Sequence, residues 1–279
     1  MGTTEQVRYL SRVARAVATQ PGESIERVRE KLAEHHDRRA AWAPYMPAPH
    51  AERDMHAALG LPWPCPVRAE FAGVWSELLD ELAGQGLAVG RGSFAGWDDG
   101  DEGLVRMAWC LARHLRPRVV VETGVARGLT SAALLRALAR NGAGHLWSID
   151  LPPLAEHELG SETGAAVLPA DAPRWTLVCG SSRRVLPGLV RTLQTVDLFV
   201  HDSMHTGRNV DFELAQVWPA LADGGAVLVD DVHRNASFGM FAEGHPEATS
   251  LVSRSDDGGA LFGCLVKPGR HARVAAVPA

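Results

Sequence analysis

The feature that most constrains the fold is the alternation of short apolar segments with helical patterns that begins at about Asp101. Residues 119–121 are three valines, which is typical of a strand buried on both faces of a parallel sheet. Further strands are predicted over residues 145–150, 176–179, 196–201 and 226–229, with helical spacing between them. This order predicts a parallel sheet covered by helices on both sides.

The end of the alternating region has a different pattern. Two apolar segments, residues 250–252 and 260–266, flank the turn-forming residues 255–259, which indicates a β-hairpin. The sequence therefore predicts an α/β fold with a Rossmann-like, doubly wound sheet. This sheet is expected to be mostly parallel, with a C-terminal antiparallel hairpin.

Residues 1–100 follow helical patterns separated by turn-rich breaks, without a convincing strand. Apolar residues recur at helical spacing over residues 7–17, 25–32 and 67–82. Ser24 is the predicted N-cap of the second of these helices. We therefore divide the chain into a helical N-terminal segment (1–100), expected to form a lid or an oligomer contact, and a cofactor-binding domain (101–279).

The amino-acid composition limits the kinds of partner that the chain is expected to bind. The 279 residues carry a formal net charge of -5, so a basic surface for nucleic acid is not expected. No apolar segment is long enough to span a bilayer, and the first residues lack the pattern of a secretion signal. The four cysteines lie far apart without a zinc pattern, and three are expected to be small buried apolar residues. A cytoplasmic protein is therefore predicted.

The segment from Val121 to Ser131 joins the first predicted strand to its helix. Gly124 and Gly128 permit a sharp turn and a close approach of a ligand to the backbone. The free N–H groups of the following helix favour a polar group. Asp150 ends the next strand, where a carboxylate can accept both hydroxyls of a ribose. Together these features favour a cofactor that contains a nucleoside.

Two cofactors compete for a loop of this kind. A dinucleotide requires G-x-G-x-x-G, whereas Ala126 stands where the middle glycine allows close approach of a pyrophosphate. S-Adenosylmethionine (SAM) carries no phosphate and accommodates the alanine more easily. The loop therefore favours SAM over NAD, and a nicotinamide-dependent oxidoreductase is the less favoured alternative.

Acidic residues follow the fourth and fifth predicted strands. The fourth strand ends in His201-Asp202-Ser203-Met204-His205, and the fifth in Asp230-Asp231-Val232-His233. Ligands of an open parallel sheet bind at the carboxyl ends of its strands, and carboxylate oxygens favour Mg²⁺ or Mn²⁺. Asp202, Asp230 and Asp231 are therefore candidate metal ligands. His205 is a candidate general base for a hydroxyl whose pKa the metal lowers.

Simpler explanations stay open for the same residues. Asp202 can cap the helix that follows its strand, and Asp230-Asp231 can form a turn or a cap. His201 is expected to be a packing or surface residue. Arg127 and Arg208 flank the candidate site, and a solvated position is expected for each.

The pattern E-x-G-x-x-x-G after the first strand, Ser148-Ile149-Asp150 after the second and the closing hairpin resemble class I SAM-dependent methyltransferases over about residues 101–268. The resemblance implies that Glu122 lies near the methionine amine and that Asp150 binds the ribose. It also places Gly180-Ser181-Ser182 near the adenine. The cofactor-binding residues implied in this way are Glu122, Thr123, Gly124, Gly128, Ser131, Asp150, Ser181, Ser182 and Asp202.

The acidic strand ends are also similar to those of metal-dependent small-molecule O-methyltransferases of bacterial natural-product pathways, of the macrolide-sugar and cephamycin-pathway types. In that group an aspartate after strand four and an acidic pair after strand five hold Mg²⁺, and a histidine three residues after the first aspartate acts as base. Asp202, Asp230, Asp231 and His205 fall on those positions. Residues 1–100 match no segment of that group, which leaves the acceptor undefined.

We therefore expect a Mg²⁺-assisted, SAM-dependent O-methyltransferase (EC 2.1.1 type), acting on a hydroxyl of a small molecule such as a sugar or a phenol. A homo-oligomer is expected. Two alternatives remain: a metal-independent small-molecule methyltransferase, and a protein of the same fold with a non-methylating role, such as a cyclase or a scaffold.

Overall fold

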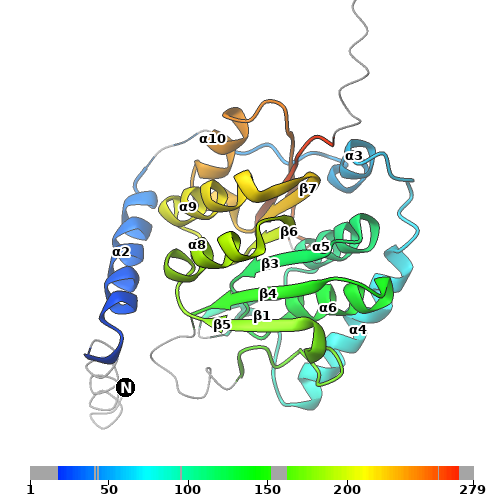
Figure 1. Ribbon diagram of the computed structural model, residues 1–279, viewed down its shortest axis with the longest axis horizontal. Helices are drawn as coiled ribbons and strands as arrows, with labels where there is room; N and C mark the ends of the chain where they lie inside the picture. The colour runs from blue at the N-terminus through cyan, green and yellow to red at the C-terminus, as the bar shows by residue number, and fades with distance from the viewer. Residues whose placement is uncertain are drawn as a thin grey trace, which may run out of the picture.

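The computed structural model describes residues 18–40, 42, 44–94, 96–151, 162–256 and 258–269. Its centre is a seven-stranded sheet with the strand order β5-β4-β3-β6-β7-β9-β8 (Figure 1). Strands β3 to β7 pair in parallel, whereas β9 pairs antiparallel with both β7 and β8. The strands are β3 (Val119–Thr123), β4 (His145–Asp150), β5 (Trp175–Cys179), β6 (Val196–His201), β7 (Leu221–Val229), β8 (Thr249–Arg254) and β9 (Leu261–Val266). The predicted fold class is confirmed.

Helices cover both faces of this sheet (Figure 1). On one face, α4 (Arg68–Gly84), α5 (Glu102–Leu115) and α6 (Leu129–Asn141) form one apolar core with Val120 of β3. On the other face, α8 (Ser182–Leu193), α9 (Gly207–Val217) and α10 (Ser237–Glu243) form a second core with Val121. Successive side chains of a strand point to opposite faces, so both Val120 and Val121 of β3 lie in an apolar core. Short 3-10 turns lie at Ala172–Arg174, Trp218–Ala220 and Val232–Arg234.

The strand order reverses between β3 and β6, at the centre of the sheet. Thr123 of β3 pairs with His201 of β6, and the backbone N–H of Asp202 donates to the carbonyl of Thr123 (2.8 Å). The loop after β3 and the acidic end of β6 therefore meet at the switch point, where open α/β sheets bind their ligands.

The N-terminal segment contains the helices α2 (Pro21–Asp37) and α3 (Ala51–Ala58) before α4. The prediction of Ser24 as an N-cap is wrong, because α2 begins three residues earlier with Pro21 in its first turn. Proline suits this position because its fixed φ is helical and its missing N–H has no partner there anyway. The hydroxyl of Ser24 instead donates to the carbonyl of Gln20 (3.2 Å). The helix predicted over residues 7–17 lies outside the described residues.

The segment predicted without strands contains a short antiparallel hairpin, β1 (Gly90–Phe94) with β2 (Trp97–Asp99). Its sequence lacks alternation of apolar residues, and Gly92 and Gly96 have positive φ. Contacts from a distant part of the chain hold it instead: the Arg127 guanidinium donates to the carbonyls of Ala88 (2.5 Å) and Ser93 (2.8 Å). Because tertiary contacts decide this hairpin, local patterns did not reveal it.

Two element boundaries near the fifth predicted strand also differ from the prediction. The helix predicted between the fourth and fifth strands ends at Val217, because Pro219 cannot continue an α-helix. Strand β7 then begins at Leu221 rather than at the predicted residue 226, and it includes Asp223 to Gly225. The pairing of β6 with β7 shifts register across this part. Among the described residues, no helix is both long and apolar enough to cross a membrane.

Candidate functional site

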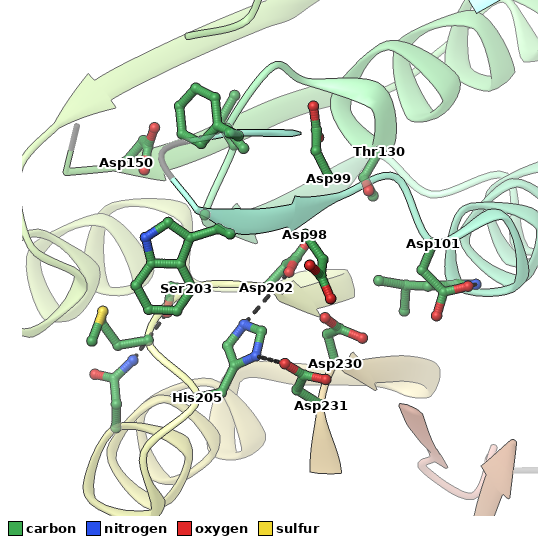
Figure 2. Close-up of a pocket in the computed structure, with 18 of the residues that line it drawn as sticks. Asp98, Asp99, Asp101, Thr130, Asp150, Asp202, Ser203, His205, Asp230 and Asp231 are labelled. Carbon is green, nitrogen blue, oxygen red and sulfur yellow. Dashed lines mark hydrogen bonds and ion pairs between the residues drawn. The ribbon is translucent and has the colours of Figure 1, made fainter. Parts of the chain in front are cut away.

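A cavity of about 1230 Å³ lies at the carboxyl ends of the parallel strands. Its wall includes the loop after β3, the ends of β4, β6 and β7, and parts of α2 and the β1–β2 hairpin. Figure 2 shows acidic side chains from several of these elements around one space. Ligand pockets commonly measure about 300–1,000 Å³, so this cavity has room for a cofactor and a small second molecule.

The loop after β3 requires both of its glycines. Gly124 has a φ of +84°, and a Cβ there would lie 1.9 Å from the carbonyl oxygen of Asp202. Gly128 has a φ of +82°, and a Cβ there would lie 3.0 Å from the Cα of Gly164. The expectation that these glycines expose bare peptide to a ligand is thus incomplete, because protein backbone occupies the side where their Cβ atoms would be.

Ala126 also lies in the left-handed region, with a φ of +47°. Its carbonyl accepts from the N–H of Gly164 (2.9 Å), which holds the strained backbone in place. Strain of this kind persists only where the surroundings fix it, and it is concentrated at functional sites. Ala126 lines the cavity together with Gly124 and Val125.

Asp150 brings an unsatisfied acceptor to the cavity. Its Oδ1 accepts from the N–H of Leu151 (2.8 Å). Its Oδ2 is buried without a hydrogen-bond partner among the described residues. Burial raises the pKa of Asp150 to about 6, against the lowering effect of hydrogen bonds from the backbone of Leu151 and Val125. A ligand hydroxyl is the natural partner for the free oxygen, because an unpaired buried acceptor is costly.

Glu122 and Ser131, both predicted to bind the cofactor, are not among the cavity-lining residues. Glu122 lies on the same side of β3 as Val120, toward α6, because strand side chains alternate. Its Oε2 accepts from the hydroxyls of Ser131 and Ser148, each at 2.6 Å. Burial raises the pKa of Glu122 to about 8, although these two hydrogen bonds lower it. At neutral pH this carboxyl is therefore mostly protonated.

Glu122→Gln is expected to gain stability relative to the wild-type chain as the pH rises. The folded-state pKa of about 8 lies above the ordinary value of 4.5, so the folded chain keeps a proton that the unfolded chain has released. Between these values the wild-type chain loses up to about 1.4 kcal/mol of stability per pH unit relative to the variant. Denaturant unfolding over this range measures the difference, with the exposed Glu77→Gln as control. Parallel pH profiles for wild type and Glu122→Gln would contradict the assignment.

Thr123, another predicted cofactor residue, points to the opposite face and also stays outside the cavity wall. Its hydroxyl donates to Glu213 Oε2 (2.5 Å), and the same carboxylate pairs with His201 Nδ1 (2.7 Å). Glu213 also accepts from Ser203 and Asn209. Its burial would raise its pKa, but the charge and hydrogen bond of His201 dominate and lower it to about 2. Glu213 thus joins α9 to the ends of β3 and β6, and sequence patterns gave no sign of this role.

The turn after β5 reaches the cavity as predicted, because both Ser181 and Ser182 line it. The Ser181 hydroxyl is buried without a hydrogen-bond partner among the described residues. Its backbone N–H donates to Glu23 of α2 (3.1 Å). The Ser182 hydroxyl instead donates to Asn209 (3.4 Å). Ser181 is therefore the better placed of the two for a ligand contact.

The structure brings together the acidic ends of β6 and β7 (Figure 2). One ligand atom each of Asp202, His205 and Asp230 lie within 4.8 Å of one another, an arrangement that can hold a metal ion. Asp230 Oδ1 is buried without a hydrogen-bond partner among the described residues. Asp231 is engaged elsewhere: its Oδ2 accepts from His205 Nδ1 and from Arg234 Nε, each at 2.6 Å. The geometry therefore favours His205 over Asp231 in the set with Asp202 and Asp230.

The carboxylates determine the charge of His205. Burial alone would lower its pKa, but hydrogen bonding to Asp202 and Asp231 and the nearby charges raise the pKa to about 10. Asp230 has a pKa raised well above its ordinary value, first by burial and then by the charge of Asp202. Burial would likewise raise the pKa of Asp231, but hydrogen bonding and charge from His205 lower it to about 2. With these carboxylates unneutralised, His205 is an imidazolium and donates protons rather than accepting them.

The capping explanations for these acids do not hold. The N-cap of α9 is Thr206, whose hydroxyl accepts from the N–H of Asn209 (3.2 Å), so Asp202 does not cap this helix. Asp231 precedes the 3-10 turn Val232–Arg234 with a φ of +53°, and its side chain makes no capping hydrogen bond. Asp202 and Asp231 therefore do not cap helices, whereas the expectation that Asp230-Asp231 form a turn is confirmed.

Sequence reasoning missed further acids at the same cavity, among them Asp98, Asp99 and Asp101. Asp99 is buried 3.4 Å from Arg127, and burial raises its pKa to about 6 despite that charge. Asp101 caps α5 by accepting from the N–H groups of Gly103 and Leu104. The dense run of acids over residues 98–102 was the available signal, but it belonged to a segment that was predicted to be helical.

Both arginines that were expected to be solvated instead make contacts that hold elements of the fold together. Arg127 is only 5% exposed and fastens the hairpin to the loop after β3. Arg208 pairs with Glu26 (2.8 Å) and Glu30 of α2. The two arginines therefore attach the N-terminal elements to the cavity wall.

Residues 121–232 match the family model described as a methyltransferase domain. No curated protein sequence matches the chain. The chain is similar in structure to the SAM complex of the O-methyltransferase TomG from Streptomyces achromogenes, involved in tomaymycin synthesis (20% identity, TM-score 0.50, covering 70% of this chain and 90% of that one). It is also similar to a putative O-methyltransferase from Klebsiella pneumoniae (16% identity, TM-score 0.52, covering 78% and 96%). The solved structures show a shared fold, and the family model places a similarity to methyltransferase domains on residues 121–232.

Proposed function

We propose that this chain is a SAM-dependent O-methyltransferase that acts on a hydroxyl of a small molecule. The observation that carries the proposal is Asp150 Oδ2, which is buried without a partner in the described part of the chain and belongs to a residue that lines a large cavity beside the strained loop after β3. The match to a methyltransferase domain covers this loop and both acidic strand ends. The similar structure of TomG, an O-methyltransferase crystallised with SAM, agrees with this assignment.

The residues present fit the cofactor. Asp150 Oδ2 supplies an acceptor for ribose hydroxyls, and the Ser181 hydroxyl, which has no partner within the described ranges, supplies a polar contact on the neighbouring turn. Gly124, Ala126 and Asp202 line the same cavity. When bound, SAM supplies an electrophilic methyl group. Glu122 and Ser131 are proposed to support the loop from behind rather than to contact the cofactor.

The acidic strand ends fit a divalent cation. Asp202, His205 and Asp230 provide two carboxylates and an imidazole, and Asp230 Oδ1 lacks another partner among the described residues. Carboxylate oxygens favour Mg²⁺ or Mn²⁺, which would lower the pKa of an acceptor hydroxyl. A cation at these residues would also offset the negative charge that keeps His205 protonated. In a second arrangement Asp202 and Asp230 alone would hold the cation, and His205 would then be free to take the hydroxyl proton as a general base.

The rest of the cavity wall favours an acceptor with an aromatic ring. Phe94 and Trp97 of the hairpin and Met204 after β6 line the space beside the acidic cluster. Such side chains bury a planar ring efficiently, whereas a sugar would leave them in contact with hydroxyls. Val28 and Leu32 of α2 also line the cavity. This arrangement supports the proposed lid role of the N-terminal segment.

Asp150→Ala is expected to weaken SAM binding by about 10- to 100-fold, because a charged hydrogen-bond acceptor contributes about 1.5–3 kcal/mol. Isothermal titration calorimetry with SAM and with S-adenosylhomocysteine measures the change. Asp80→Ala on the exposed face of α4 is the matched control, and its affinity should equal that of the wild-type chain. Tight NAD binding without a response to SAM would overturn the proposal in favour of an oxidoreductase.

Methyl transfer is tested with the full chain, SAM and simple catechols, by following S-adenosylhomocysteine with Mg²⁺ and with a chelator. Turnover that requires the cation supports the metal-assisted reaction, whereas full turnover with chelator supports the metal-independent alternative. SAM binding without transfer to any hydroxyl acceptor would favour a cyclase or scaffold role.

A further inference from the structure

A second group of metal-binding side chains lies away from the cavity, between the N-terminal helices and α5. His56 belongs to α3, Cys65 precedes α4, and Cys110 and His114 belong to α5. None of the four lines the cavity. One ligand atom each of His56, Cys65 and His114 lie within 4.8 Å of one another. The sulfur atoms of Cys65 and Cys110 are 3.4 Å apart.

His56 is prepared to accept a ligand bond. Its side chain has no exposed surface, and its Nδ1 lies 2.7 Å from the backbone carbonyl of Glu52. A carbonyl accepts only, so Nδ1 carries the proton and Nε2 keeps a free electron pair. Nε2 is buried without a hydrogen-bond partner among the described residues. A histidine whose other nitrogen donates to a backbone carbonyl is the usual arrangement of a metal ligand.

The other three side chains are arranged around Cys65. Cys110 and His114 are four residues apart and so share one face of α5. In a tetrahedron with Zn–S bonds of about 2.3 Å and Zn–N bonds of about 2.0 Å, neighbouring ligand atoms lie about 3.3–3.8 Å apart. The separations of Cys65 Sγ from Cys110 Sγ (3.4 Å) and from His114 Nε2 (3.5 Å) agree with these values. Cys110 is not in the 4.8 Å group of His56, Cys65 and His114, so its sulfur has to move toward the two histidines when a metal binds.

We propose that His56, Cys65, Cys110 and His114 form a structural Zn²⁺ site. Two thiolates and two neutral imidazoles complete a closed four-coordinate shell, which leaves no position for a substrate. Each thiol releases its proton to solvent as its sulfur binds the metal. The site joins α3 and the start of α4 to α5, and α5 packs on the central sheet. It therefore fastens the N-terminal segment to the domain that carries the cavity.

The sequence spacing H-x8-C followed by C-x3-H in a distant helix explains why no zinc pattern was found from the sequence. The ligands come from two segments that only the fold brings together.

Cobalt substitution tests the proposal directly. The full chain is purified under reducing conditions, stripped with a chelator, titrated with Co²⁺ and passed over a desalting column. We expect one retained equivalent with a thiolate-to-cobalt charge-transfer band and the visible bands of tetrahedral Co²⁺, displaced by Zn²⁺. The acidic cluster at the cavity has no thiol and cannot give this band. Absence of the band in the folded chain overturns the proposal.

Variants identify the ligands. Cys65→Ser and Cys110→Ser should each weaken the charge-transfer band, the double variant should lose it, and His56→Gln should lower metal retention. Cys179→Ser, at an exposed cysteine in β5, should leave both unchanged. Zn²⁺ should raise the unfolding temperature of the wild-type chain in proportion to the logarithm of its free concentration. This shift does not depend on the variants being folded, and its absence would overturn the proposal.

Intact mass measurement of the freshly purified chain distinguishes the zinc site from a disulfide bond between Cys65 and Cys110. A mass lower by two hydrogens, reversed by reductant, would show a Cys65–Cys110 disulfide and overturn the zinc site. The present sulfur separation is longer than the disulfide bond length of about 2.05 Å. A mass with both thiols present, together with bound zinc, supports the proposal.

Discussion

Replacing Gly124 with alanine is expected to abolish SAM binding at concentrations that saturate the wild-type chain. A Cβ at this position would lie 1.9 Å from the carbonyl oxygen of Asp202, and that backbone has no flexible end that can move aside. The loop after β3 and the end of β6 must therefore separate. This movement changes the floor of the cavity and displaces Asp202 from the acidic cluster. Calorimetry with SAM measures the loss.

Gly142→Ala is the matched control for this experiment. Gly142 ends α6 with a φ of +72°, so alanine there meets similar backbone strain of about 1 kcal/mol. A Cβ at Gly142 meets no heavy atom within 4 Å. Gly142→Ala should therefore lower stability slightly and keep SAM affinity. Equal SAM affinities in the two variants would show that the close contact with Asp202 does not determine the conformation of the loop after β3.

The strands, their order of appearance and the closing hairpin follow from local patterns. The three valines of β3 are apolar on both faces, and the hairpin residues flank a turn-rich segment. The acidic ends of β6 and β7 could be placed together because parallel strands end at one edge of the sheet. This part of the candidate site was therefore predictable without any long-range information.

The direction of individual side chains was harder to predict. Glu122 and Thr123 are neighbours in the sequence, yet they point to opposite faces of the sheet, and neither lines the cavity. Their partners, Ser148 and Glu213, lie 26 and 90 residues away. A sequence pattern marks the strand end but does not show which side of it a helix will cover.

The contribution of the N-terminal segment depended entirely on tertiary contacts. The hairpin is held by Arg127, and α2 is held by the pairing of Glu26 and Glu30 with Arg208. These buried charges looked like solvated residues in the sequence, because their partners are distant. The acids that this segment adds to the cavity, Asp99 among them, were missed for the same reason.

His205→Gln is expected to lower the turnover number by about 10²- to 10⁴-fold, the usual contribution of a general base. SAM affinity should change by less than about threefold, because the ring lies among the carboxylates of Asp202 and Asp231 rather than beside Asp150. His233→Gln is the matched control. His233 lies 3.7 Å from Asp231 and is partly exposed, but it is not a member of the group with Asp202 and Asp230.

The same variant separates the two roles that the geometry allows for His205. If His205 is the base, the acid limb of the wild-type pH–rate profile disappears in the variant, and added Mg²⁺ restores nothing. If His205 is a cation ligand, the variant needs more Mg²⁺ for half-maximal turnover and recovers at high concentration. Unchanged turnover over all Mg²⁺ concentrations would exclude both roles. Reaction would then rest on Asp202 and Asp230, whose ligand atoms remain close enough to share a cation.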